Sequence, residues 1–311
     1  MTVQELWKEG NHILSEAGIE EAILDSRYLL EWVLQCNHSY LLLNPNSLVT
    51  MEQEQQYRTA ILERKGHKPL QYIVGEQEFM GYSFLVNEHV LIPRQDTEIL
   101  VETVLKHMQE CMETASGCEN LQEDTEADTV YKILDMCCGS GCIGISLWKK
   151  INEKQQGMCQ VIVSDISSEA LEVTRENAKR LKADVEIIKS DLFQAIKGKF
   201  HILVSNPPYI PSKVVDTLMP EVREYEPRLA LDGSPDGLFF YRNIIEQAKD
   251  YLEEEGYVFF EIGFDQAEDV RKIFVDAGFE QVMIKQDLAG LDRVIYAKLP
   301  AGKNHATSKQ R

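Results

Sequence analysis

Residues 133–144, which read ILDMCCGSGCIG, combine an apolar segment, a turn of small residues and the start of a helix. The apolar segment has the composition of a buried strand. Gly139 and Gly141 allow the backbone to approach a ligand closely, and Gly144 allows the helix to pack on the sheet. The amino end of that helix favours a negatively charged group of the ligand. This strand–turn–helix unit predicts a doubly wound α/β sheet that binds a ligand at the turn.

Asp165 ends the next predicted strand along the chain. A carboxylate in this place accepts hydrogen bonds from both hydroxyls of a ribose, so we expect a bound nucleoside. The residues do not specify which nucleoside it is. Asp191, at the tip of the third strand, has two open interpretations: it contacts an adenine amino group, or it caps a helix.

From Tyr131 onward, strands and helices alternate along the chain. Strands are expected at 131–136, 160–165, 186–190, 200–205, 256–262, 281–286 and 292–299. Helices are expected at 141–154, 167–182, 237–254 and 265–277, with an irregular link after Asp191. This alternation predicts a seven-stranded, mostly parallel sheet that is covered on both faces. Residues 287–291 are too short for a parallel crossover, so the last two strands are predicted to form an antiparallel hairpin.

Residues 205–209, which read SNPPY, directly follow the apolar run at 200–204. The two prolines lack an N–H group and end the strand, and Asn206 is biased to an extended conformation. A planar amino group would donate its two N–H bonds to the Asn206 side-chain oxygen and to the Pro207 carbonyl. The Tyr209 ring would then pack on its flat face, which is catalysis by orientation. The alternative is an ordinary Asn-Pro turn between a strand and a loop.

The first part of the chain has a helical pattern and no chemical motif. The apolar positions are Leu6, Ile13 and Leu14 in a first helix, and Ile23, Leu24, Leu29, Leu30, Val33 and Leu34 in a second. Thr50 is expected to cap a third helix, which ends near Lys65 with Gly66 as its stop. Short paired strands are expected within 76–92, with turns at Met80-Gly81 and Asn87-Glu88. We therefore predict a helical docking domain at 1–75, a β-hairpin linker at 76–92, and an α/β domain at 93–299.

The remaining segments are expected to be structural or solvated. Asp96 is a candidate cap for the helix that follows it, and Arg94 is either a partner in an ion pair or part of a cleft. The acidic residues 110–129 are expected to form a mobile loop, and residues 300–311 a disordered tail. Cys137, Cys138 and Cys142 match no common zinc spacing, so we expect packed thiols and no metal.

Composition narrows the class of protein. The formal net charge of -19 repels polyanions, and the sequence has no strongly basic run, so we expect no direct nucleic-acid partner. No segment is long and apolar enough to span a bilayer, so no membrane association is expected. The seven cysteines and the lack of a secretory signal indicate reduced thiols and a cytoplasmic protein.

Taken together, the motifs resemble those of the release-factor glutamine methyltransferases of the HemK/PrmC type, which depend on S-adenosylmethionine. The matching segments are Pro93-Arg94 and Thr97-Glu98, the glycine loop, Asp165, NPPYI at 206–210, YEPRLAL at 225–231, DGL at 236–238, EIG at 261–263 and DLAGLDR at 287–293. The sequence departs from the family in two places. Cys137-Cys138 replace the usual Gly-Thr of the loop, which puts side chains where the backbone is otherwise bare. Leu192 stands where many members have Trp, which is expected to weaken packing around adenine.

The resemblance implies a class I, Rossmann-like methyltransferase fold and methylation of the glutamine in the Gly-Gly-Gln motif of class 1 peptide chain release factors. It implies a cofactor site made of Cys137, Cys138, Gly139, Ser140, Gly141, Asp165, Asp191, Leu192 and Asn206. It also implies that Asn206, Pro207, Pro208 and Tyr209 hold the substrate amide and are catalytic, and that the helical domain docks the substrate of a monomeric enzyme.

Four alternatives remain open at this point. A glutamine methyltransferase for a ribosomal protein would share these motifs. An adenine-amino methyltransferase of DNA or RNA would share residues 206–209, but base flipping needs a basic surface. A nicotinamide-dependent oxidoreductase would use the glycine loop and leave residues 206–209 unexplained. A binding module without activity would use residues 1–75 as its working part.

Overall fold

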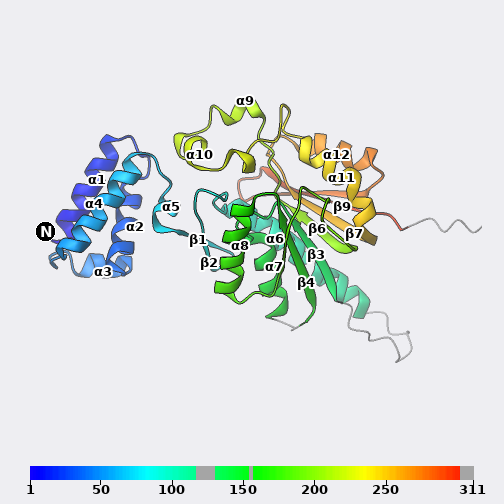
Figure 1. Ribbon diagram of the computed structural model, residues 1–311, viewed down its shortest axis with the longest axis horizontal. Helices are drawn as coiled ribbons and strands as arrows, with labels where there is room; N and C mark the ends of the chain where they lie inside the picture. The colour runs from blue at the N-terminus through cyan, green and yellow to red at the C-terminus, as the bar shows by residue number, and fades with distance from the viewer. Residues whose placement is uncertain (117–129, 154–156, 302–311) are drawn as a thin grey trace, which may run out of the picture.

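The computed structural model describes residues 1–116, 130–153 and 157–301. A small unit of helices at the N-terminus is joined through a β-hairpin to a larger α/β unit (Figure 1). No helix in the described ranges has both the length and the hydropathy needed to cross a membrane.

The N-terminal unit consists of α1 (Val3–Glu16), α2 (Ala22–Leu34), α3 (His38–Leu43), α4 (Met51–Lys65) and α5 (Leu70–Val74). Thr50 caps α4 as predicted, in a capping box with Gln53. Helix α3, whose first turn is capped by the Asn37 side chain, was not predicted. The core is formed by Leu6, Leu14, Leu29, Leu30, Tyr57 and Ile61.

The predicted apolar face of α2 was partly wrong. Ile23 and Leu24 are exposed, whereas Asp25 and Ser26 are buried. Burial of these two polar side chains is tolerated because each of them has a polar partner in the interior. The Ser26 hydroxyl accepts a hydrogen bond from Trp7 Nε1 at 3.1 Å, and Asp25 forms an ion pair with Arg64.

The linker forms the predicted hairpin of β1 (Glu76–Phe79) and β2 (Tyr82–Leu85), with Phe79 opposite Tyr82. Helix α6 follows and spans Gln95–Ser116. Two predictions are corrected here. Asp96 lies inside the first turn of α6 and is not its cap, and residues 110–116 are helical rather than a loop. The rest of the predicted acidic loop, and the predicted tail from 302, lie outside the described residues.

The α/β unit contains the seven predicted strands: β3 (Tyr131–Met136), β4 (Cys159–Asp165), β5 (Glu186–Lys189), β6 (Phe200–Ser205), β7 (Leu252–Glu261), β8 (Glu280–Gln286) and β9 (Asp292–Lys298). Their order is β5-β4-β3-β6-β7-β9-β8. Strand β9 pairs antiparallel with both neighbours, and the other described pairs in this sheet are parallel. The predicted class I sheet with an antiparallel hairpin at its end is therefore confirmed.

Helices cover both faces of the sheet because successive residues of a strand point to opposite sides. On one face, Ile133, Val163 and their neighbours pack with α6, α7 (Cys142–Asn152) and α8 (Ser168–Leu181). On the other face, Leu134 and Phe260 pack with α11 (Phe239–Tyr251) and α12 (Ala267–Asp276). Three short elements that follow β6 were not predicted: α9 (Ser212–Val215), α10 (Pro220–Tyr225) and the 3₁₀ turn Arg228–Ala230.

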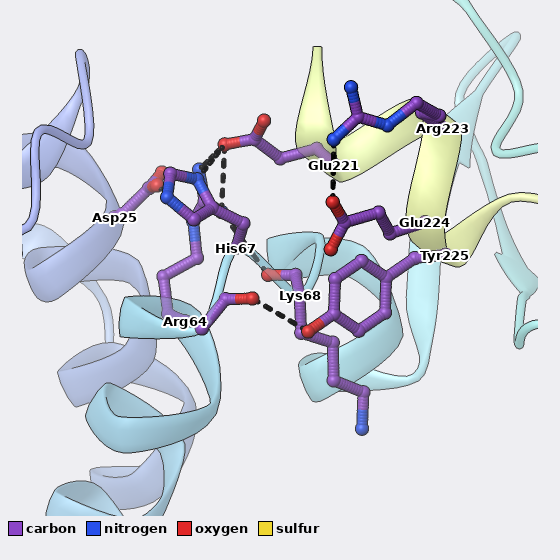
Figure 2. Close-up of polar contacts among 9 residues, drawn as sticks. Asp25, Arg64, His67, Lys68, Glu221, Arg223, Glu224 and Tyr225 are labelled. Carbon is purple, nitrogen blue, oxygen red and sulfur yellow. Dashed lines mark hydrogen bonds and ion pairs between the residues drawn. The ribbon is translucent and has the colours of Figure 1, made fainter. Parts of the chain in front are cut away.

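Helix α10 connects the two units through a cluster of polar contacts (Figure 2). Arg64 at the end of α4 bonds through its Nε to Asp25 at 2.7 Å, and its Nη2 lies 3.2 Å from Glu221 Oε1 on α10. His67 Nδ1 lies 3.2 Å from the same Glu221 oxygen. The Tyr225 hydroxyl donates to the Gly66 carbonyl at 2.6 Å. The side chain of Arg64 is only 10% exposed, so its contacts with Asp25 and Glu221 are partly shielded from water, which strengthens the attraction between the charges.

Glu221→Gln is expected to destabilise the N-terminal unit by about 1–2 kcal/mol, because the charged acceptor shared by Arg64 and His67 is lost. The measurement is urea unfolding followed by tryptophan fluorescence, since Trp7 and Trp32 lie in this unit. Glu224→Gln is the matched control on the same helix, because Glu224 pairs with its neighbour Arg223 at the surface. Equal stability of the two variants would show that this cluster does not hold the units together.

Candidate functional site

A cavity of about 320 Å³ opens at the carboxyl ends of β3, β4 and β6. The chain runs from β3 outward to β5 and then returns to the other side of β3 with β6, so this is the point where the strand order reverses. Ligands of open α/β sheets bind at such points. The predicted site residues that line the cavity are Cys137, Cys138, Gly139, Ser140, Asp165, Asp191, Leu192, Asn206 and Pro208. Gly141, Pro207 and Tyr209 lie next to these residues in the chain but are not part of the lining.

The loop after β3 is held by hydrogen bonds from α8. The Thr174 hydroxyl donates to the Gly139 carbonyl at 2.7 Å, and the Asn177 amide donates to the Ser140 carbonyl at 2.9 Å. Gly139 has a φ of 54°, and no described heavy atom lies within 4 Å of the place where its Cβ would stand. Cys137 also has a positive φ, 60°, a backbone conformation that favours glycine. The loop therefore keeps the bend of a glycine loop despite the two cysteines.

Asp165 lies beside this loop, at the end of β4. Its Oδ2 accepts the Gly139 N–H at 2.9 Å, and its Oδ1 accepts the Ser167 N–H at 2.9 Å. Burial raises the pKa of Asp165, and the hydrogen bonds from Ser167 and Gly139 work in the opposite direction. Each carboxylate oxygen has further lone pairs, so the side chain can accept hydrogen bonds from a ligand in the cavity.

Asp191 and Leu192 line the cavity after β5, the strand that pairs with β4. Residues 190–199 contain no helix, so Asp191 is not a helix cap, and that interpretation was wrong. Its Oδ2 instead accepts a hydrogen bond from Gln194 Nε2 at 3.0 Å. Its contact with an adenine amino group stays a prediction.

Asn206 begins the rigid corner after β6 and faces the cavity. Its Nδ2 lies 3.4 Å from the Thr97 hydroxyl oxygen, so the amide is turned with its nitrogen towards α6. The Tyr209 hydroxyl donates to Glu261 Oε1 at 3.3 Å, and the Tyr209 carbonyl accepts from Gln266 Nε2 at 2.9 Å. The corner is therefore fixed at both ends by side chains from other elements.

The structure adds Thr97 and Glu261 to the predicted site. Glu261 is buried at the end of β7, and the sequence alone assigned it no role. The available signal was a charged residue at the carboxyl end of an otherwise apolar strand. Both predictions for Arg94 are confirmed. It forms an ion pair with Glu226 at 2.6 Å, and it also lines the cavity.

Cys138 and Cys142 are buried, and Cys137 is half-buried at the edge of the cavity. Burial raises the pKa of Cys142 to about 12, and it also raises the pKa values of Cys137 and Cys138. Neutral thiols are poor metal ligands. Among the described residues there is no group of three or more His, Cys, Asp and Glu side chains placed to hold a metal ion.

Asp135 lies beneath the loop, fully buried, and its Oδ2 accepts the Gly144 N–H at 2.8 Å. Its Oδ1 has no hydrogen-bond partner among the described residues. Burial, helped by the charge of Asp165, raises the pKa of Asp135 to about 8.

The raised pKa of Asp135 predicts a pH dependence of stability. The folded state holds this proton more tightly than the unfolded state, so the stabilisation is complete below about pH 4 and is lost as the pH rises through about 8. The Tm of the wild type should therefore fall between pH 5 and 8 by about 5 °C more than that of Asp135→Asn, which does not titrate. Thermal melting of both proteins across this range is the measurement. Parallel curves would contradict the assignment.

Two family models match segments of this chain. Residues 5–75 match the family model described as the PrmC N-terminal domain, and residues 113–223 match the methyltransferase small domain. The release factor glutamine methyltransferase of Clostridium botulinum is 40% identical over 303 residues, which cover 96% of this chain and 99% of that protein. The protein of the same name from Geobacter sulfurreducens is 37% identical and covers 94% of each chain.

Among solved structures, the hMettl16 catalytic domain in complex with an RNA hairpin superposes with a TM-score of 0.51 at 14% identity. The match covers 82% of this chain and 85% of that one, and at this identity it supports the fold alone. The two curated relatives, by contrast, align with this chain over almost its whole length. The chain therefore belongs to the family of release factor glutamine methyltransferases.

Proposed function

We propose that this protein transfers a methyl group from S-adenosylmethionine to the side-chain amide nitrogen, N5, of the glutamine in the Gly-Gly-Gln motif of class 1 peptide chain release factors. Family membership supports the reaction and its substrate. The single observation that carries the proposal is the position of Asn206. Its side chain faces the cavity, and its amide nitrogen is bound to Thr97, so its oxygen is left to accept a hydrogen bond from a substrate amide.

The cavity fits the cofactor. Gly139 leaves the space of a side chain open, Asp165 offers acceptor oxygens for ribose hydroxyls, and the wall at Leu192 is apolar. S-adenosylmethionine, when bound, supplies a methyl group that is already activated on a sulfonium. The chain itself binds the nucleoside through residues 137–141, Asp165 and Asp191.

The substrate amide is the difficult partner, because its nitrogen lone pair is delocalised. The Asn206 oxygen and the Pro207 carbonyl accept its two N–H bonds and fix its direction, while Tyr209 packs on its flat face. Both acceptors become stronger as positive charge grows on the nitrogen, so they stabilise the transition state more than the ground state. The proton can leave after transfer, so no strong base is required beforehand.

We further propose that the three predicted regions divide the work. Residues 1–75 dock the protein substrate, residues 76–92 link the units, and residues 93–299 carry the catalytic site. The enzyme acts as a monomer in the cytoplasm, where release factors work. Its net charge of -19 supports a protein substrate over a nucleic acid.

The test is mass spectrometry of a release factor after incubation with the enzyme and S-adenosylmethionine. We expect a gain of one methyl group on the glutamine of Gly-Gly-Gln, and no gain when S-adenosylhomocysteine replaces the donor. Methylation of a ribosomal protein in place of the release factor would favour the first alternative. Labelled duplex DNA or RNA retained on a filter would favour the adenine-amino alternative.

A further inference from the structure

Gln266 is a buried glutamine that joins three segments around the catalytic corner. It directly precedes α12, and it is only 7% exposed. Its Nε2 donates to the Tyr209 carbonyl at 2.9 Å and to the Gly237 carbonyl at 3.3 Å. Its Oε1 accepts the Gly263 N–H at 3.0 Å. One side chain therefore ties the corner to the loop before α11 and to the segment after β7.

The backbone groups around Gln266 fix the direction of its amide. A backbone N–H only donates and a carbonyl only accepts, so these roles do not depend on pH. In the present direction, the amide oxygen meets one donor and the amide nitrogen meets two acceptors. A half-turn would set the NH2 group against the Gly263 N–H and the oxygen against two carbonyls, so all three hydrogen bonds would be lost. The NH2 group is therefore committed to the carbonyls of Tyr209 and Gly237.

The loop before α11 packs directly on the backbone of Tyr209. A Cβ on Gly237 would overlap the Tyr209 carbonyl oxygen and would lie 2.7 Å from Gln266 Nε2. A Cβ on Gly233 would lie 2.7 Å from Tyr209 Cα. The carbonyl of Ile210, the next residue in the chain, accepts the Gly233 N–H at 2.8 Å. The position of the Tyr209 backbone is therefore set by contacts from outside the corner.

This hold on the backbone also affects where the Tyr209 ring lies, because the ring follows its own main chain. The far end of the ring is held by the hydroxyl, which donates to Glu261 Oε1 at 3.3 Å. The hydrogen bond from Gln266 to the Tyr209 carbonyl is shorter, at 2.9 Å, and its acceptor is a main-chain atom. Gln266 is therefore the tighter of the two anchors of this residue.

We propose that Gln266 is a positioning residue, which holds the Tyr209 backbone so that the ring lies flat against the substrate amide. The proposal rests on the proposed function, and it goes further by assigning the placement of this ring to a buried amide outside residues 205–209. Without the Nε2 donor, the Tyr209 carbonyl loses its partner and the backbone shifts towards another donor. A displacement of about 1 Å near the reacting groups can cost roughly a hundredfold in rate.

The first experiment measures kcat on an intact release factor, and the Kd of S-adenosylhomocysteine, for Gln266→Met and Gln266→Glu. Methionine keeps the length of the side chain, and ionised glutamate keeps its shape, but neither can donate to the two carbonyls. We expect kcat to fall by roughly tenfold or more in both variants. The Kd should stay within about threefold of the wild type, because the expected cofactor contacts lie at residues 137–141, Asp165 and Asp191. Equal losses in kcat and in cofactor affinity would overturn the proposal.

Gln247→Met is the matched control for this experiment. Gln247 lies exposed on α11, and its Nε2 bonds to the Asn243 carbonyl of the same helix. The substitution is the same in chemistry, but no carbonyl of the corner loses its donor. This variant should keep the kcat of the wild type.

The second experiment uses double-mutant cycles, which separate placement of the ring from a general effect on packing. Single-turnover rates with a tritiated methyl donor are measured for Tyr209→Leu and Tyr209→Phe, each with and without Gln266→Met. Leucine has no flat ring to place, so Gln266→Met should change the rate of Tyr209→Leu by less than about twofold. Phenylalanine keeps the ring, so Gln266→Met should still lower the rate of Tyr209→Phe by roughly tenfold. The same fold loss in both backgrounds would overturn the proposal.

Circular dichroism and thermal melting establish that each variant is folded. If Gln266→Met does not fold, Gln266→Glu replaces it in the same cycles. Wild-type kcat in the folded Gln266 variants would overturn the proposal while leaving the proposed function intact. Failure of the wild type to methylate the release factor would instead remove the proposed function, and with it the basis of this inference.

Discussion

Asn206→Ala is expected to lower kcat for release-factor methylation by roughly a hundredfold or more. The substitution removes the oxygen that accepts one N–H bond of the substrate amide, and this contact strengthens as charge develops in the transition state. The Pro207 carbonyl alone cannot fix the direction of the nitrogen. The measurement is the initial rate of tritiated methyl transfer to an intact release factor at saturating substrate.

The control for this substitution is Asn243→Ala on α11. The Asn243 side chain is half-buried, bonds to the Phe239 carbonyl of its own helix and does not line the cavity, so the variant should keep full activity. Turnover of Asn206→Ala near that of the wild type would refute the catalytic role of the corner.

Asp165→Ala is expected to weaken binding of S-adenosylhomocysteine by roughly a hundredfold. Two hydrogen bonds from ribose hydroxyls to a carboxylate are lost, and each contributes about 1.5 kcal/mol or more. The N–H groups of Gly139 and Ser167 also lose their acceptor, so the loop itself is less well ordered. Isothermal titration calorimetry gives the Kd directly.

The matched control is Asp184→Ala, an exposed aspartate before β5 at the opposite end of the sheet. It should bind the ligand with the affinity of the wild type. A Kd for Asp165→Ala within about threefold of the wild type would contradict the assigned contact with the ribose.

The sheet could be predicted from sequence because its signals are local. Each strand is a short apolar run bounded by turn residues, and the five-residue link at 287–291 is too short for anything but a hairpin. The glycine loop and residues 205–209 follow two such runs, β3 and β6, which are neighbours in the sheet. Their residues therefore meet at one cavity, as expected for the carboxyl ends of parallel strands.

The polar contacts around the site could not be predicted, because their partners are far apart in the sequence. Thr97, Asn206 and Glu261 come from α6, the end of β6 and the end of β7. No spacing rule relates these positions. The same reason applies to Arg64 and Glu221, which join the two units across the molecule (Figure 2).

The error at α2 has a different cause. Ile23 and Leu24 fit an apolar stripe by residue type, but the helix turns Asp25 towards Arg64 and Ser26 towards Trp7. A buried ion pair overrode the hydrophobic pattern at this end of the helix. Short elements such as α3 and α10 were missed because a helix of six residues has too few positions to show a period.

The central claim is that the corner at residues 206–209 grips the glutamine amide and points its nitrogen at the cofactor. The most direct test is a crystal structure of the enzyme with S-adenosylhomocysteine and a peptide that contains Gly-Gly-Gln. We predict that the glutamine NH2 group lies within hydrogen-bond distance of both Asn206 Oδ1 and the Pro207 carbonyl, with its nitrogen facing the sulfur. A structure in which this corner turns away from the sulfur, and is filled by the protein's own side chains, would contradict the claim.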